Sequence, residues 1–275
     1  MKVILSLFLI LLFSTFVTPI INAGYITMKT HTTVNVTDNS LKVKVTATNE
    51  GDEAAYNVQI NTTENQRVQS SPIKQVLAVK DSFECESVFD LPYTKHGRYP
   101  LVISIDYTDA NQYPFTAPSA TYYSFGSDTV STVFGSAKDV RLKNFATIQL
   151  MLKNIGEVFR EVQIWLITPK ELSVQEKIKK ETLQPRSELN TAFTVSNFSA
   201  LPGSRYQVFF IIEYEDESKH YSNIVPCFIN LEESKVFFKK YKWYIIAVPS
   251  ALFVALIIFQ FILQKPGKQK GKPSN

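Results

Sequence analysis

One phrase occurs twice in this chain, about a hundred residues apart. The first copy reads KVTATNEGDEAAYNVQI from Lys44, and the second reads LMLKNIGEVFREVQI from Leu150. A second match follows in the same order, because GRYPLVISIDYTD from Gly97 is echoed by SRYQVFFIIEYED from Ser204. Two matches in one order indicate a duplicated domain, and a repeat of about 100 residues has the size of an immunoglobulin-like sandwich.

Each copy sets an Asn-x-Gly triplet between two runs of alternating apolar residues. The triplets begin at Asn49 and Asn154 and end at Gly51 and Gly156. Asn tolerates, and Gly readily adopts, the positive φ that a tight reversal requires. We therefore predict a strand, a turn and a strand in each copy, with both glycines at positive φ.

Alternation along the second match predicts which side chains are buried. In the first copy Leu101, Ile103 and Ile105 alternate with polar or smaller residues, and Tyr107 continues their parity, so these positions face the core. The same parity predicts four core residues in the second copy, namely Val208, Phe210, Ile212 and Tyr214.

That parity leaves apolar residues pointing away from the second core. Phe209 and Ile211 face outward, and Trp165 and Ile167 do so on the strand expected beside them. One explanation is packing against the first domain or against the charged segment 169–180. The other is a protein partner, because apolar surface around a central Trp is typical of interfaces.

Apolar runs at the two ends of the chain predict its topology. Residues 1–23 resemble a cleavable secretory signal peptide, with an uncleaved anchor as the alternative. Trp243 to Leu263 is 21 residues without a charge, long enough to span a bilayer core of about 30 Å, with a buried core helix as the alternative. An exporting signal places the body outside the cytoplasm and the short C-terminus inside it.

The predicted segments follow from these runs and from the repeat. We expect a signal peptide at 1–23, a first immunoglobulin-like sandwich at 24–126 and a second at 127–234. A juxtamembrane segment and transmembrane helix at 235–264 and a lysine-rich cytoplasmic tail at 265–275 complete the chain. The fold class expected is all-β, with two tandem immunoglobulin-like β-sandwiches plus one C-terminal transmembrane helix.

The net charge of +4 belongs to the ends of the chain. Eight of the 29 basic residues flank the C-terminal apolar run and Lys2 is a ninth, so 20 remain in the body against 25 acidic residues. The body is mildly acidic and has no basic patch interleaved with aromatic residues, which argues against nucleic-acid binding.

Catalytic motifs are missing from the sequence. His31, His96 and His220 are expected in solvated loops, and their spacing is not that of metal ligands. No nucleophile elbow or phosphate-binding loop occurs, so we expect no enzyme activity and no cofactor.

Acidic and aromatic clusters leave a ligand-binding alternative open. Oxygen-rich residues gather where the last two strands of each repeat would meet, a composition that calcium requires but that hairpin turns also favour. These residues are Asp106, Asp109 and Asn111 in the first copy, and Glu213, Glu215, Asp216 and Glu217 in the second. Candidate glycan-binding rings are Tyr107, Tyr113, Tyr122 and Tyr123, with Tyr107 better explained as core.

Two further features matter in an exported protein. Asn35, Asn61 and Asn197 fit the N-glycosylation pattern, which would matter in a eukaryotic secretory pathway. Cys85 and Cys227 lie at non-equivalent places in the two repeats, so a bridge within one domain is excluded. Two buried free thiols or a disulfide between the domains are the alternatives, the latter requiring Cα atoms within about 7 Å.

The phrases VTATNEGDEAAYNVQI, LAVKDSFECESVFDL and GRYPLVISIDYTDAN together resemble the CARDB-type immunoglobulin-like modules of bacterial and archaeal surface proteins. The resemblance covers 24–125 well and 128–231 less well, and it implies a non-catalytic module displayed outside the cell. In layout the chain is also similar to translocon-associated protein subunits of the endoplasmic reticulum, which typically carry one such domain.

The function expected is a single-pass membrane protein that displays its domains outside the cytoplasm as a protein-binding scaffold or accessory subunit. The compartment would be periplasmic or extracellular, or lumenal in a eukaryote. The partner-binding residues expected are Trp165, Ile167, Phe209 and Ile211. The alternatives are a glycan- or calcium-binding adhesion module and an accessory protein of the translocon.

Overall fold

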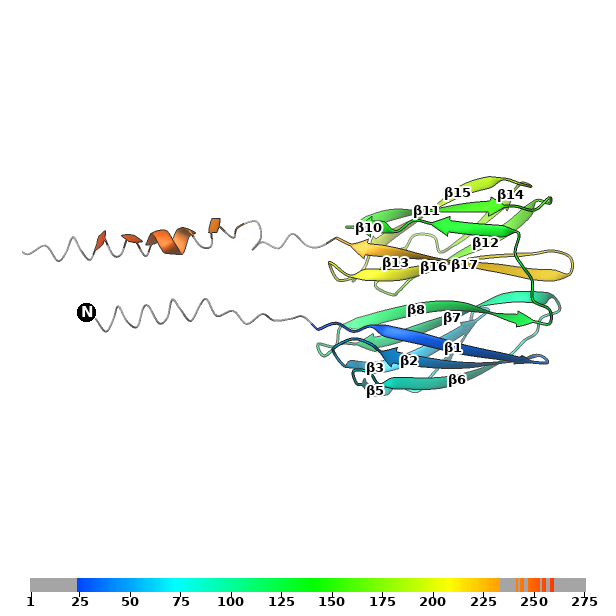
Figure 1. Cartoon of the computed structure of the whole chain (residues 1–275), viewed down its shortest axis with the longest axis horizontal. Helices are drawn as coiled ribbons and strands as arrows, with labels where there is room; N and C mark the ends of the chain where they lie inside the picture. The colour runs from blue at the N-terminus through cyan, green and yellow to red at the C-terminus, as the bar shows by residue number, and fades with distance from the viewer. Residues whose placement is uncertain are drawn as a thin grey trace, which may run out of the picture.

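The computed structural model describes residues 24–232 and the helical residues 241, 243–244, 247–252, 254–255 and 258–259 (Figure 1). The predicted signal peptide, the lysine-rich tail and parts of the predicted span lie outside the described residues. In the part of the chain that is described, no helical stretch combines the length and the hydropathy needed to traverse a bilayer.

The first half of the chain forms two facing β-sheets. One sheet has the antiparallel order β1 (Met28–Thr37), β2 (Ser40–Asn49) and β6 (Ser82–Asp90). In the other, β7 (His96–Thr108) lies between β3 (Ala55–Glu64) and β8 (Pro114–Phe125). The short strands β4 (Arg67–Ser70) and β5 (Lys74–Leu77) pair with β3.

The second half repeats this plan. In one sheet β11 (Phe145–Asn154) lies between β9 (Val133–Ala137) and β15 (Glu188–Asn197), and β13 (Leu172–Val174) pairs with β15. In the other, β16 (Arg205–Glu215) lies between β12 (Arg160–Ile167) and β17 (Lys219–Leu231). β14 (Ile178–Leu183) pairs with β12, and β10 (Val140–Leu142) runs parallel to β17. The body is therefore all-β, and its strand order fits an immunoglobulin-like sandwich.

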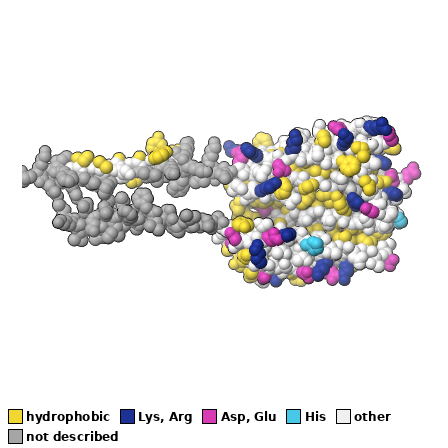
Figure 2. Space-filling view, in the orientation of Figure 1, with side chains coloured by type: hydrophobic (Ala, Val, Ile, Leu, Met, Phe, Trp, Pro, Cys, Tyr) yellow, Lys and Arg dark blue, Asp and Glu magenta, His cyan; other side chains and the backbone are white. Residues whose placement is uncertain are grey.

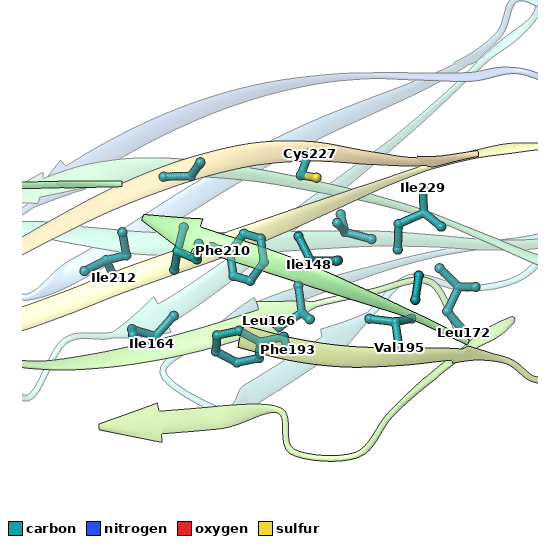
Figure 3. Packing of buried hydrophobic residues seen from close by; sticks show 14 of the residues in the cluster. Ile148, Ile164, Leu166, Leu172, Phe193, Val195, Phe210, Ile212, Cys227 and Ile229 are labelled. Atoms are coloured by element: carbon teal, nitrogen blue, oxygen red, sulfur yellow. The ribbon is translucent and has the colours of Figure 1, made fainter. Parts of the chain in front are cut away.

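Each half has its own hydrophobic core, one built from residues 41–125 and the other from residues 133–231. Val208, Phe210, Ile212 and Tyr214 are all buried in the second core, so the parity prediction is confirmed. Figure 3 shows Phe210 and Ile212 among the core side chains with Ile148 and Phe193. Alternation alone was sufficient here because each strand has one face on its own core.

The Asn-x-Gly connections differ from the prediction. Neither Gly51 nor Gly156 has a positive φ, and the strands on either side of each triplet belong to different sheets. The triplet therefore carries the chain across the sandwich and does not close a hairpin. Gly51 is required for another reason, because a Cβ there would lie 2.3 Å from the carbonyl oxygen of Tyr25.

The buried asparagines hold these crossings with the same hydrogen bonds in both copies. Asn49 Nδ2 donates to the carbonyls of Glu53 and Leu77, and its Oδ1 accepts the N–H of Gly51. Asn154 repeats the pattern with the carbonyls of Val158 and Gln184 and the N–H of Gly156. The duplication seen in the sequence therefore extends to individual hydrogen bonds.

The two sandwiches lie side by side and are joined by a short strand pairing. Lys219 and His220 of β17 pair in parallel with His96 and Gly97 of β7, which makes one continuous ten-stranded sheet. The chain turns back at residues 126–132, so the repeats run in opposite directions and both ends of the body emerge at the same end (Figure 1). We call the end of the body from which the chain enters and leaves the proximal end, and the opposite end the distal end. The second domain is therefore no nearer to the proximal end than the first.

Candidate functional site

The predicted outward patch faces the first sandwich. Phe209 and Ile211 point away from the second core but are only 7% and 3% exposed, whereas Trp165 and Ile167 are half-buried. They lose their exposure because β8 of the first sandwich contacts both β16 and β17. Of the two explanations that the sequence left open, packing against the first domain accounts for Phe209 and Ile211.

Trp165, Ile167 and Ile211 line a cleft of about 280 Å³ between the sandwiches at their distal end. We call it the distal cleft. The second sandwich contributes Trp165, Ile167, Ile211, Glu213, Glu215 and His220. The first contributes Thr63, Asn65, Gln66, Tyr93, Tyr99, Pro100 and Val102. Apolar and aromatic walls with a few polar groups are typical of binding sites.

His220 was predicted to lie in a solvated loop, and this is wrong. It lies on β17, is 7% exposed, and stacks on Tyr99 of the first sandwich with ring centroids 4.1 Å apart. His31 and His96 also lie on strands, but both are exposed. The burial of His220 could not be predicted from the local sequence, because it depends on contact with the first sandwich.

Two carboxylates flank the His220 ring. Nδ1 lies 3.1 Å from Glu215 Oε1, and Nε2 lies 3.3 Å from Glu213 Oε1. Burial raises the pKa of Glu215, but hydrogen bonds from Lys95 and His220 outweigh it and hold that pKa below its ordinary value. Lys95 Nζ donates to Glu215 at 2.7 Å, so this ion pair also joins the two sandwiches.

Two buried polar atoms in the distal cleft lack hydrogen-bond partners among the described residues. Trp165 Nε1 is buried without a hydrogen bond, and His220 Nε2 has none either, because its approach to Glu213 is poorly directed. A buried polar atom without a partner costs about 1–3 kcal/mol. Both atoms would therefore gain from a ligand that offers complementary polar groups.

A second cavity, of about 450 Å³, lies between the sandwiches at the proximal end. Its lining includes Tyr107, Phe115, Tyr206, Phe228 and Glu171. Glu171 is 2% exposed, its Oε1 accepts the N–H of Thr116 at 3.0 Å, and its Oε2 has no partner among the described residues. Burial raises the pKa of this carboxyl. We call this space the proximal cavity.

The acidic hairpin residues mostly support local structure. Asp109 Oδ1 accepts the N–H groups of Asn111 and Tyr113, and Asp216 Oδ1 accepts those of Ser218 and Lys219. Within the described residues, no group of three or more His, Cys, Asp or Glu side chains is arranged to hold a metal ion.

The predicted glycan-binding tyrosines do not form a row. Tyr123 is buried in the first core, and Tyr122 lies under the guanidinium of Arg98. The hydroxyl of Tyr113 donates to the carbonyl of Ser199 in the second sandwich. Tyr107 lines the proximal cavity.

Glu64 is a buried carboxylate that sequence reasoning missed. It accepts hydrogen bonds from the hydroxyls of Tyr93 and Tyr123 and from the guanidinium of Arg67. Its position in the alternation would have found it, because it follows Ile60 and Thr62 on the inward face of β3.

The three asparagines of the predicted N-glycosylation triplets differ in their surroundings. Asn35 is exposed on β1, whereas the Asn61 amide donates to Asp106 and the Asn197 amide donates to the carbonyl of Ala200. Cys85 and Cys227 are both free, and Cys227 points into the second core (Figure 3). Burial raises the pKa of the Cys227 thiol to about 11.

No protein-family model matches this chain, and no curated protein matches it. Among solved structures, native α2-macroglobulin of E. coli aligns over 76% of this chain and 17% of its own, with 8% identity and a TM-score of 0.32. Red sea bream transglutaminase aligns over 78% of this chain and 32% of its own, with 10% identity and a TM-score of 0.28. This chain thus spans a third or less of either protein, and we draw no function from such distant likeness.

Proposed function

We propose that this chain is a non-catalytic single-pass membrane protein that displays two immunoglobulin-like sandwiches outside the cytoplasm as a protein-binding scaffold or accessory subunit. The observation that carries the proposal is the distal cleft, which opens at the end of the body opposite to the one where the chain enters and leaves. A cleft held away from the membrane in this way is accessible to a partner.

Two observations support membrane attachment. The sequence has an uncharged run from Trp243 to Leu263, and large side chains of its described helical residues are exposed, including Leu252 at 60% and Phe259 at 60%. An apolar helix without a protein surface to cover it is suited to lipid.

A rigid body supports a scaffold role. Three interactions connect the two sandwiches. They are the strand pairing at Gly97 and His220, the ion pair between Lys95 and Glu215, and the ion pair between Lys170 and Asp106. On the face seen in Figure 2, Lys and Arg side chains are interspersed with Asp and Glu, as is typical of a solvated surface.

The distal cleft suits an extended peptide segment that carries a basic side chain. Trp165 Nε1 requires an acceptor, which a backbone carbonyl supplies, and the half-buried carboxylate of Glu213, which lies near His220, can also pair with a basic side chain. The rings of Tyr93 and Trp165 provide the aromatic surroundings that favour a cation, whereas Tyr99 is already stacked on Tyr93 and His220.

Photo-crosslinking from the intact protein in its own membrane tests this function. We expect a crosslinker at Trp165 to capture one discrete partner, and one at the exposed Val88 of β6 to capture none. Glu213→Gln should weaken the Trp165 crosslink at least several-fold, whereas Glu86→Gln on β6 should not. An unchanged crosslink in Glu213→Gln, or none at Trp165, would contradict the proposal.

The proximal cavity favours a second candidate, a glycan-binding module. It combines aromatic rings with the unpartnered Oε2 of Glu171, which would accept a hydrogen bond from a sugar hydroxyl. A glycan array probed with the intact protein and with Glu171→Gln tests this candidate. Binding that Glu171→Gln abolishes would favour it over the scaffold.

A further inference from the structure

The start of β11 and the loop between β15 and β16 expose large apolar side chains at the proximal end of the second sandwich. Phe145 is 71% exposed and Phe198 is 78% exposed, and Leu201, which also lines the proximal cavity, is 37% exposed. We call these three residues the end face. Exposed apolar residues that gather at one place usually mark a contact surface.

The end face is held firmly by the backbone. Phe145 pairs with Ser196 across β11 and β15, and the N–H of Asn197 donates to the carbonyl of Asn144 at 3.0 Å. The N–H of Phe198 donates to the carbonyl of Glu171 at 3.0 Å. Little conformational entropy would therefore be lost when these side chains meet a surface.

The end face is also where the chain leaves the body. The N–H of Leu231 donates to the carbonyl of Ser204, and that of Glu232 donates to the carbonyl of Leu142. Only ten residues separate Glu232 from Trp243, the first residue of the uncharged run. Even fully extended, that segment spans about 40 Å at most.

Charged neighbours of the end face favour an anionic surface. Arg141 and Lys143 are exposed beside Phe145, whereas Asp139 is paired with Arg205. Each basic residue near an anionic membrane contributes about 1 kcal/mol of attraction. Aromatic side chains flanked by basic ones are the composition of surfaces that enter the boundary between headgroups and acyl chains.

We propose that the end face is a lipid-contacting surface, with Phe145 and Phe198 inserted at the headgroup level of the membrane that anchors the chain. Both sandwiches would then stand upright on the bilayer, with the distal cleft pointing away from it. This inference rests on the proposed membrane attachment and adds the orientation of the body.

Depth-dependent fluorescence quenching of the full chain in lipid vesicles tests the inference. A fluorophore is attached to the cysteine of Phe198→Cys or, as the control, of Glu217→Cys, each in a Cys85→Ser background. Glu217 is exposed on the hairpin between β16 and β17 at the distal end. We expect lipids with a shallow spin label to quench the fluorophore at position 198 several-fold more than the one at position 217. Arg141→Ser combined with Lys143→Ser should reduce that quenching in anionic vesicles.

Further measurements separate the possible failures. Resistance of the protein to alkaline extraction reports membrane attachment independently of the label. If the protein is embedded but position 198 is quenched no more than position 217, the body does not lie on the lipid and the inference is overturned. Protection of position 198 from aqueous iodide without lipid quenching would mean that protein covers the end face, which also overturns it.

Discussion

The carbonyl oxygen of His220 lies 2.0 Å from the place that a Cβ atom on Gly97 would occupy. These residues are partners in the short parallel pairing that joins β17 to β7. No larger residue fits at position 97 unless the strands separate, because real Cβ atoms do not approach a backbone oxygen this closely. A glycine at position 97 is therefore required for the strand pairing that joins the two sandwiches.

We expect Gly97→Val to break the junction while both sandwiches remain folded, since each has its own core. Small-angle X-ray scattering should show a larger radius of gyration, and the amide of His220 should lose protection from hydrogen exchange. Gly156→Val is the control, because its nearest neighbours are side-chain atoms at 3.2 Å. Unchanged scattering in Gly97→Val would contradict the expectation.

Replacing the buried asparagines compares one repeat with the other. Asn49→Asp and Asn154→Asp keep the oxygen that accepts the glycine N–H but remove the donor that serves two carbonyls. We expect each change to destabilise its own sandwich by about 1–3 kcal/mol. Hydrogen exchange, measured separately for the amides of each sandwich, checks this expectation. Equal loss of protection in both sandwiches from one substitution would instead indicate that the two unfold together.

The strand positions were predictable because alternation is a local property of the chain. Val208 to Tyr214 obeyed it, since one face of β16 meets the core of its own sandwich. The Asn-x-Gly crossings were misread because the same residues suit a hairpin and a passage between sheets. The difference lies in which strands pair, which depends on residues far away in the sequence.

The candidate site was only partly predictable, for a related reason. The apolar character of Trp165 and Ile211 was visible in the sequence, but the surface that covers them belongs to the other sandwich. The contribution of Tyr99 and His220 was not foreseen, because they meet only after the chain has turned back on itself.

Phe209 and Trp165, two residues of the predicted patch, differ in burial. Phe209 is 7% exposed, so we expect Phe209→Ser to lower the free energy of unfolding by roughly 3 kcal/mol. Half-buried Trp165 faces the cleft, so Trp165→Ser should cost clearly less. Denaturant titrations of both variants check the order, and equal losses would mean that Trp165 is part of a closed interface.

Gly51 should be less tolerant than Gly156 despite their matching places in the repeat. A Cβ at position 51 would lie 2.3 Å from the carbonyl oxygen of Tyr25, whereas one at position 156 would meet side chains at 3.2 Å. We expect Gly51→Ala to destabilise the first sandwich by about 1–3 kcal/mol through overpacking, and Gly156→Ala to cost less. Thermal unfolding of the two variants checks this, and a larger loss for Gly156→Ala would contradict it.

Asp128, in the segment between the sandwiches, should make stability depend on acid pH. Hydrogen bonds from the Arg98 guanidinium, at 2.7 and 3.1 Å, lower the pKa of Asp128 to about 2, helped by Ser124 and the N–H of Thr129. The folded carboxyl thus binds its proton less readily than the unfolded one, whose pKa is about 3.9. Its stabilising contribution is present above that value and is lost as the pH falls through about 2.

Asp128→Asn tests this contribution through its pH dependence. Because the side chain is 55% exposed, we expect the substitution to cost about 1 kcal/mol or less at pH 6. The difference from the native protein should shrink as the pH is lowered from 4 to 2, since the native carboxylate then becomes neutral as well. Arg98→Met should lose stability with the same pH profile, and the double variant should lose little more than either change alone. A difference between Asp128→Asn and the native protein that stays constant down to pH 2 would mean that shape, and not charge, is what Asp128 contributes.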